Sequence, residues 1–181
     1  MGRLTRIILA LTLAALPAGG AWASDLITVP TSTPVEVPLH DQAGFDWSGF
    51  YAGIYGGVQG SDLGGTQYGL GVQAGVNTQF DFYLLGAEVA VEGLTGDVGN
   101  TSYGQILGRA GLVVTDDVLV YAAGGYGIDL GAPAEEDALL GGGVEMAVTD
   151  SLSVRAQYLR GVPTQGGNPK NQFTFGANFH F

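Results

Sequence analysis

The last ten residues of the chain alternate strictly between apolar side chains and polar or small ones. Phe173, Phe175, Ala177, Phe179 and Phe181 occupy every second position. A β-strand turns successive side chains to opposite faces, so this pattern predicts one strand with a wholly apolar face. A face that carries four phenylalanines must be buried in a protein core or lie against lipid.

Seven earlier segments show the same period of two, which predicts seven more strands. In each segment apolar side chains occupy one face, and glycine, amide or charged side chains dominate the other. The strands span roughly the 9–11 residues that a tilted membrane strand needs. We expect them at residues 50–59, 68–80, 83–94, 103–114, 118–128, 138–148 and 152–160, followed by the terminal strand.

The predicted connections alternate between tight and long. The tight ones are 81–82, 115–117 and 149–151, and the long ones are 60–67, 95–102, 129–137 and 161–171. Outer-membrane β-barrels alternate short periplasmic turns with long extracellular loops in the same way. The sequence therefore predicts an all-β, eight-stranded antiparallel up-and-down transmembrane barrel with both termini in the periplasm.

Antiparallel pairing across the tight connections brings faces of the same kind together. The expected opposed pairs are Val148 with Leu152, Met146 with Val154, Glu145 with Arg155, Phe80 with Tyr83, and Val76 with Ala87. A shift by one residue would turn one strand's apolar face to the wrong side, so the pairing is well specified. The single acid opposite the single base predicts an ion pair between Glu145 and Arg155.

Aromatic side chains of the apolar faces fall at two levels of the predicted barrel. Membrane barrels carry aromatic girdles at both interfaces with water. We expect a periplasmic girdle of Phe50, Phe80, Tyr83, Phe179 and Phe181, and an outer girdle of Tyr68, Tyr126, Tyr158 and Phe173.

Composition narrows the class of protein further. No apolar run approaches the roughly 20 residues of a membrane-spanning helix, and only helices and closed barrels satisfy the backbone in lipid. The absence of cysteine excludes disulfides, thiolate metal sites and a cysteine nucleophile. The formal charge of −11 argues against a nucleic-acid partner.

Residues 1–23 have the pattern of a secretory signal peptide. Arg3 and Arg6 precede a short apolar stretch, and the small residues Ala21 and Ala23 suit cleavage before Ser24. A short buried helix is the alternative interpretation of this stretch.

The next segment, residues 24–46, contains three prolines and has no usable period. Proline removes backbone donors and favours an extended chain, so we interpret this segment as a periplasmic linker. The barrel domain is then expected at residues 47–181.

Several ionisable side chains lie on faces that should point into the barrel. Buried charges are stable only when they are paired and hydrogen-bonded, and eight strands leave an interior that side chains just fill. We therefore expect a salt-bridge network that plugs the lumen, with a narrow ion-conducting path as the alternative. The residues concerned are Glu88, Glu92, Arg109, Glu145 and Arg155.

From residue 45 onward the chain resembles the OmpA-like eight-stranded barrels, and most of all the outer-membrane β-barrel family of porin-like surface proteins. The resemblance is carried by Asp-Trp-Ser-Gly-Phe-Tyr-Ala-Gly at 46–53, Gly-Arg-Ala-Gly at 108–111, Leu-Val-Tyr at 119–121 with Gly124 and Gly125, and the strand that ends in Phe181. It implies an outer-membrane location and a largely structural or surface role.

The resemblance also implies roles for particular residues. Barrels of this kind hold acids on strands three and six that face bases on strands four and seven, which matches Glu88, Glu145, Arg109 and Arg155. Their C-terminal aromatic residue, here Phe181, is an assembly signal for the barrel-assembly machinery.

The long loops are rich in acids: Asp62, Asp97, Asp129, Glu135, Glu136 and Asp137. The group around Glu135 is a candidate for divalent cations that bridge lipopolysaccharide phosphates, whereas the simpler interpretation is solubility. The expected partners are therefore outer-membrane lipid and lipopolysaccharide, together with host or surface ligands at the loops.

Some small outer-membrane barrels are lipid A acylases or deacylases that need a histidine with a serine and an acid. His40 falls in the linker and His180 at the end of the last strand, and neither is expected to have a matched serine and acid. We therefore expect no enzyme activity, no cofactor and no metal.

Two other function classes stay open. One is a narrow porin-like channel for ions or small solutes. The other is a periplasmic lipocalin-like barrel, which would need an apolar interior and a charged exterior.

Overall fold

The computed structural model of the protein describes residues 44–61, 65–97, 99–131, 135–164 and 168–181. The predicted signal peptide, residues 24–43 of the predicted linker, and His40 and Asp62 lie outside the described residues.

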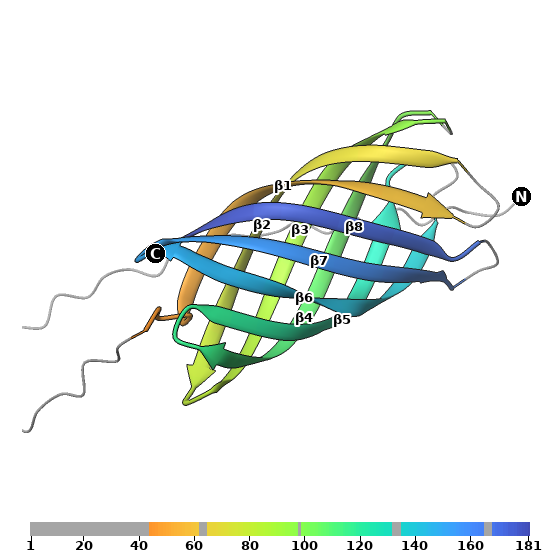
Figure 1. The fold of residues 1–181 in the computed structure, drawn as a ribbon. Coiled ribbons are helices and arrows are strands. Elements are labelled where there is room, and N and C mark those ends of the chain that lie inside the picture. Colours follow the sequence, from red (N-terminus) through yellow and green to blue (C-terminus); the bar gives the residue numbers. More distant parts are fainter. Residues whose placement is uncertain (1–43, 62–64, 98, 132–134, 165–167) are drawn as a thin grey trace, which may run out of the picture. The chain divides into compact units, whose positions relative to one another are not determined.

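Eight antiparallel strands form one closed barrel in which each strand pairs with its neighbours in sequence and β8 pairs with β1 (Figure 1). The predicted fold class, an all-β eight-stranded antiparallel barrel, is therefore confirmed. The strands are β1 (Gly49–Ser61), β2 (Thr66–Phe80), β3 (Tyr83–Gly96), β4 (Thr101–Thr115), β5 (Val118–Asp129), β6 (Glu136–Thr149), β7 (Leu152–Pro163) and β8 (Lys170–His180).

The connections differ between the two ends of the barrel. At one end, here called the turn end, pairs of residues at 81–82, 116–117 and 150–151 join the strands. At the other end, here called the loop end, the strands include residues that were predicted to lie in the loops, so the connections are shorter than expected. At the turn end Asp81 has a φ of 58°, a left-handed conformation that aspartate tolerates in tight turns.

The register across the tight turns agrees with the prediction at four of the five expected pairs. The ladder pairs Phe80 with Tyr83, Val76 with Ala87, Met146 with Val154 and Glu145 with Arg155. The expected pair of Val148 with Leu152 is wrong, because the ladder shifts between Ala147 and Thr149 and Leu152 pairs with Thr149. An extra residue of this kind is a β-bulge, which alternation alone does not reveal.

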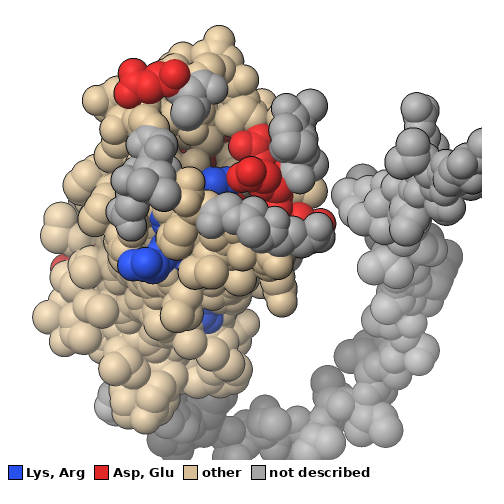
Figure 2. Space-filling view, turned by 90° about the vertical axis from the view of Figure 1, so that its right-hand side faces the viewer, with Lys and Arg blue, Asp and Glu red and all other residues tan. Residues whose placement is uncertain are grey.

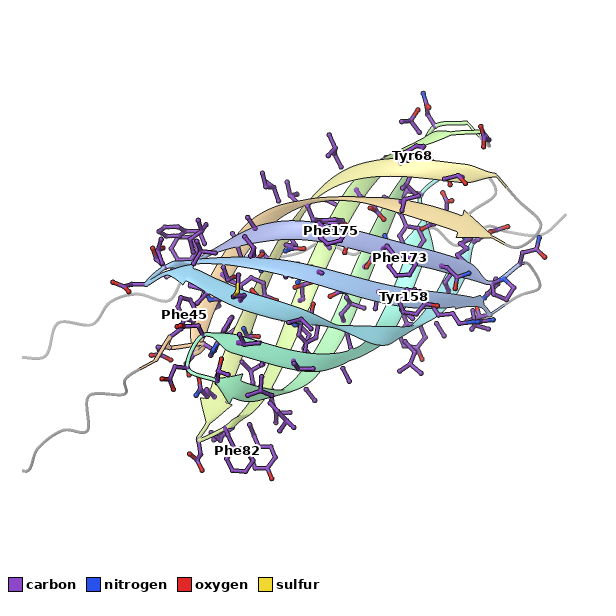
Figure 3. All side chains as sticks on the ribbon, in the orientation of Figure 1. Phe45, Tyr68, Phe82, Tyr158, Phe173 and Phe175 are labelled. Atoms are coloured by element: carbon purple, nitrogen blue, oxygen red, sulfur yellow. The ribbon has the colours of Figure 1, made fainter. Side chains whose placement is uncertain are left out.

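The two faces of the sheet have opposite polarity, and the apolar one is on the outside (Figure 3). Phe175 is 70% exposed and Ile54 67% exposed, whereas Gln73, Glu88 and Arg109 are buried in the interior. This arrangement is the reverse of what the lipocalin-like alternative requires. No helix in the described part of the chain is long and apolar enough to cross a membrane.

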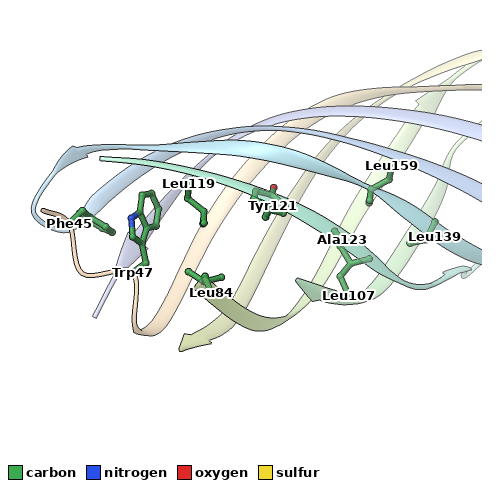
Figure 4. Packing of buried hydrophobic residues seen from close by; sticks show 9 residues of the cluster. All are labelled: Phe45, Trp47, Leu84, Leu107, Leu119, Tyr121, Ala123, Leu139 and Leu159. Atoms are coloured by element: carbon green, nitrogen blue, oxygen red, sulfur yellow. The ribbon is translucent and has the colours of Figure 1, made fainter. Parts of the chain in front are cut away.

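The interior also contains an apolar cluster that the sequence analysis did not predict (Figure 4). Its members come from β3 to β7 and from the segment before β1, and they are Phe45, Trp47, Leu84, Leu107, Leu119, Tyr121, Ala123, Leu139 and Leu159. The lumen is therefore polar in parts and packed with aliphatic and aromatic side chains in others.

Candidate functional site

The charged centre of the lumen is built around Arg109 of β4. Its guanidinium donates to Glu145 Oε2 at 2.6 Å and to the Tyr51 hydroxyl at 2.7 Å, and it lies 3.6 Å from Glu88 Oε2. Its Cζ also lies 4.0 Å from the ring centroid of Tyr121, a favourable cation–π distance. Arg109 is buried, and it joins acids from two different strands.

Arg155 of β7 pairs with Glu88 on β3. Its Nη1 lies 2.5 Å from Glu88 Oε2 and its Nη2 lies 3.0 Å from Oε1, and it also donates to Gln73 Oε1. The predicted ion pair between Arg155 and Glu145 is therefore wrong. Glu145 is opposite Arg155 in the ladder, but the barrel is narrow enough for long side chains to reach strands that are not adjacent.

Glu145 receives hydrogen bonds from groups nearer the turn end. The Ser153 hydroxyl donates to Glu145 Oε1 at 2.6 Å, and Asn178 Nδ2 donates to the same atom at 2.7 Å. His180 Nε2 lies 3.0 Å from Ser153 Oγ and 3.6 Å from Glu145 Oε1. The expectation that His180 has no matched serine and acid is therefore wrong.

This group lacks the arrangement of a hydrolytic triad. In a triad the acid orients the histidine and the histidine accepts the serine proton. Here the serine hydroxyl donates to the carboxylate, and both Ser153 and Glu145 are fully buried. The group instead extends the network of the lumen to β7 and β8.

Glu92 lies in a separate layer toward the loop end. Its Oε1 accepts from Gln105 Nε2 at 3.4 Å and from Gln172 Nε2. Glu92 forms no ion pair with any described residue, so its predicted membership of the ion-pair network is wrong. The amide groups that satisfy it come from β4 and β8, which the alternation pattern did not bring together.

A further polar layer lies at the loop end. Lys170 Nζ lies 3.0 Å from Asp137 Oδ2 and 3.2 Å from Glu135 Oε2, and the Tyr103 hydroxyl donates to Asp137 at 2.7 Å. Figure 2 looks onto this end and shows acidic residues clustered beside a basic one. The candidate cation group around Glu135 is thus partly neutralised by lysine, and within the described ranges no three His, Asp or Glu side chains are grouped to hold a metal ion.

The segment before β1 caps the turn end of the lumen. Trp47 is fully buried, its ring packs edge-on against Phe45 at 4.6 Å, and His180 packs against both rings. The backbone N–H of Phe45 donates to Asp116 O, and that of Trp47 donates to Gln79 Oε1. Phe45 therefore packs with the barrel, although the prediction placed it in the linker.

The predicted girdle residues lie on the outer surface at the two ends. By strand direction Phe50, Phe80, Tyr83, Phe179 and Phe181 are at the turn end, and Tyr68, Tyr126, Tyr158 and Phe173 are toward the loop end. Tyr158 is partly buried because its ring packs against Phe173 at 4.7 Å. Phe82, in the turn after β2, packs its ring against that of Tyr83 with 4.1 Å between the ring centroids, and it was not predicted.

No protein-family model and no curated protein matches the chain. Solved structures do match it. Ail, the attachment invasion locus protein of Yersinia pestis, aligns with a TM-score of 0.56 and 12% identity, over 74% of this chain and 97% of its own. Neisserial surface protein A (NspA) aligns with a TM-score of 0.52 and 15% identity, over 74% and 98% of the two chains.

The chain has the fold of the eight-stranded outer-membrane β-barrels. The outer membrane enzyme PagL shares it, with a TM-score of 0.50 and 13% identity over 71% of this chain and 99% of its own. The predicted resemblance to these barrels is confirmed for the fold. One fold carries a surface protein and an enzyme, so function must be argued from this chain's own residues.

Proposed function

We propose that the chain is an integral outer-membrane barrel with a structural and surface role and a closed lumen. The observation that carries this proposal is the polarity of the sheet, which is apolar outside and polar with charged pairs inside. In water the exposed outer face would be costly, because burying one large apolar side chain is worth about 1.5–3 kcal/mol. Lipid removes that cost along the whole surface.

The orientation that we propose follows from the two ends of the barrel. The tight turns, the start of β1 and the end of β8 share one end of the barrel, which we place in the periplasm. The loop end, with Glu135, Glu136 and Asp137, then faces outside. Residues 1–23 act as the signal peptide, and Phe181 contributes to the assembly signal.

The packing of the lumen supports a closed barrel. The Arg109 and Arg155 ion pairs occupy its centre, Trp47 and Phe45 cap the turn end, and Lys170 lies with its acids at the loop end. Each layer is fixed by side chains from several strands. We therefore propose that the protein does not conduct ions at rest, and a narrow channel becomes an outcome of the test below.

We propose no enzyme activity, although PagL shows that this fold supports one. Ser153, His180 and Glu145 lie inside the barrel beneath the cap formed by Phe45 and Trp47. A lipid substrate outside the barrel has no access to the Ser153 hydroxyl, which is itself engaged with Glu145. Lipid A incubated with the folded protein should keep all its acyl chains.

The charge of the loop end restricts which surface ligands it can bind. Ail has been solved with the heparin analogue sucrose octasulfate, a polyanion. The described loop end of this chain carries Asp97, Asp129, Glu135 and Glu136, which would repel such a ligand. A surface partner of these loops should therefore be neutral or basic, or should bind through divalent cations.

The test is expression in a Gram-negative host followed by fractionation, gel electrophoresis with and without boiling, and planar-bilayer recording. We expect the protein in the outer membrane, a faster band before boiling than after it, and no steady conductance. Recovery as a soluble periplasmic protein would contradict the membrane location. Steady single-channel steps would contradict the closed lumen and favour the channel.

A further inference from the structure

The described cations of the barrel fall into two groups. Arg109, Arg155 and Lys170 each have carboxylate partners, and all three point inward. Arg160 of β7 is the exception, because it is exposed, lies on the outward face, and forms no ion pair with any described residue. A single unpaired cation on an apolar outer wall needs an explanation.

The neighbours of Arg160 supply a second hydrogen-bond donor. Its ladder partner on β8 is Asn171, and the Tyr158 hydroxyl donates to Asn171 Oδ1 at 2.7 Å. That bond uses the amide oxygen and leaves the Nδ2 group, with its two N–H donors, to point elsewhere. Arg160 and Asn171 therefore place a guanidinium and an amide N–H₂ group side by side, which are the donors that an anion site needs.

The position of this pair along the barrel indicates the source of the anion. Arg160 lies two residues beyond Tyr158 on the same face of β7, and Tyr158 packs on Phe173 in the outer girdle. Aromatic girdles mark the level of the lipid headgroups. The acyl region lies below, along Phe175, which is two residues past Phe173 on the same face of β8 toward the turn end and is exposed on the outer wall.

We propose that Arg160 and Asn171 bind the phosphate of an outer-leaflet lipid, whose acyl chains lie along Tyr158 and Phe173. The guanidinium group forms a planar fork that matches phosphate oxygens in a bidentate manner. The acids on β6 and its preceding loop, Glu135 and Glu136, repel the same anion and so confine it to the β7–β8 side. This inference rests on the proposed outer-membrane location.

The alternative is that Arg160 only extends its side chain into water at the interface, as long basic side chains do near membranes. In that case no phosphate is preferred and Asn171 has no role. The two accounts differ in whether phosphorylated lipid is retained after the bilayer is removed.

The test is native mass spectrometry of the folded barrel released from detergent micelles that contain bisphosphorylated lipid A. We expect a lipid adduct on the wild-type chain, about tenfold weaker retention in Arg160→Gln, and a smaller loss in Arg160→Lys and Asn171→Leu. Asn100→Asp is the matched control, because it changes the net charge by the same amount as Arg160→Gln in the distant β3–β4 connection. Its retention should equal that of the wild type.

Three results would overturn the inference. One is equal retention by the wild type and Arg160→Gln, and another is equal retention of lipid A and its dephosphorylated form. The third is displacement of the lipid by millimolar inorganic phosphate, which would assign the site to free phosphate. Heat-modifiable mobility and outer-membrane location of every variant, measured in parallel, test the proposed function separately.

Discussion

Arg155 on β7 forms a bidentate ion pair with Glu88 on β3, although the two strands are not adjacent. Its two Nη atoms lie 2.5 and 3.0 Å from the two carboxylate oxygens. Both side chains are fully or nearly fully buried. Removing one partner of a buried pair leaves an uncompensated charge, so Arg155→Ala should reduce the free energy of unfolding by about 3–5 kcal/mol. Urea unfolding of the barrel in lipid vesicles measures this loss.

A double-mutant cycle identifies the partner. Glu88→Gln combined with Arg155→Met should cost much less than the sum of the single losses, because neither charge then remains alone. The cycle of Glu145 with Arg155 is the control and should show a smaller coupling energy. A larger coupling energy in the control would mean that Arg155 pairs with its ladder partner Glu145 and not with Glu88.

Trp47 caps the turn end and should be important for stability. Its ring is fully buried against Phe45 and His180, so Trp47→Ala should cost about 3–5 kcal/mol. Trp47→Phe keeps a ring and should cost markedly less. The midpoint of urea unfolding, followed by gel mobility, gives the comparison, and equal stability of the alanine variant and the wild type would refute the role as a cap.

Two glycines should respond in opposite ways to alanine. A Cβ on Gly125 would lie 1.9 Å from the backbone oxygen of Ile106, whereas a Cβ on Gly93 meets nothing within 4 Å. Gly125→Ala should therefore destabilise the barrel by about 1–3 kcal/mol, and Gly93→Ala should be neutral or slightly stabilising. The same unfolding experiment checks both, and similar effects at the two positions would count against the close approach of β4 and β5.

Truncation of Phe181 should harm assembly more than stability. Its ring is 77% exposed at the turn end and packs against Phe179, so its contribution to the folded barrel is about 1–3 kcal/mol at most. Refolding into detergent should lose little, while the outer-membrane level in cells should fall severely. Phe181→Trp and Phe181→Tyr should restore both, and a normal outer-membrane level of the truncated chain would exclude the signal role.

The strands were predictable because each has one uniform face. Alternation identifies all eight, and the ladder confirms pairs such as Phe80 with Tyr83. The bulge beside Val148 was not predictable, since an added residue changes pairing without changing composition. Leu107 and Leu119 each lie two positions before an inward residue, Arg109 and Tyr121 respectively, and are buried inside, but the sequence analysis did not name them as interior residues.

The ion-pair partners inside the lumen could not be predicted from the pairing of adjacent strands. The sequence places Glu145 opposite Arg155, and the ladder confirms that opposition, yet the charges pair across the barrel. Such pairing depends on barrel diameter and side-chain reach, which alternation does not specify. The sequence contained one weak indication of the cap at the turn end: the aromatic residues Phe45 and Trp47 alternate with polar residues just before β1.

The most direct test of the central claim asks whether the outer face lies against lipid. In a chain that begins at Ser24, Trp47 is the only tryptophan and lies inside the barrel. A Phe175→Trp, Trp47→Phe variant moves this reporter to the outer wall. In vesicles of brominated lipid, we expect strong quenching of tryptophan fluorescence in the variant and little in the Trp47 chain; equal quenching in the two, or none in the variant, would contradict a barrel that spans the membrane with its apolar face outward.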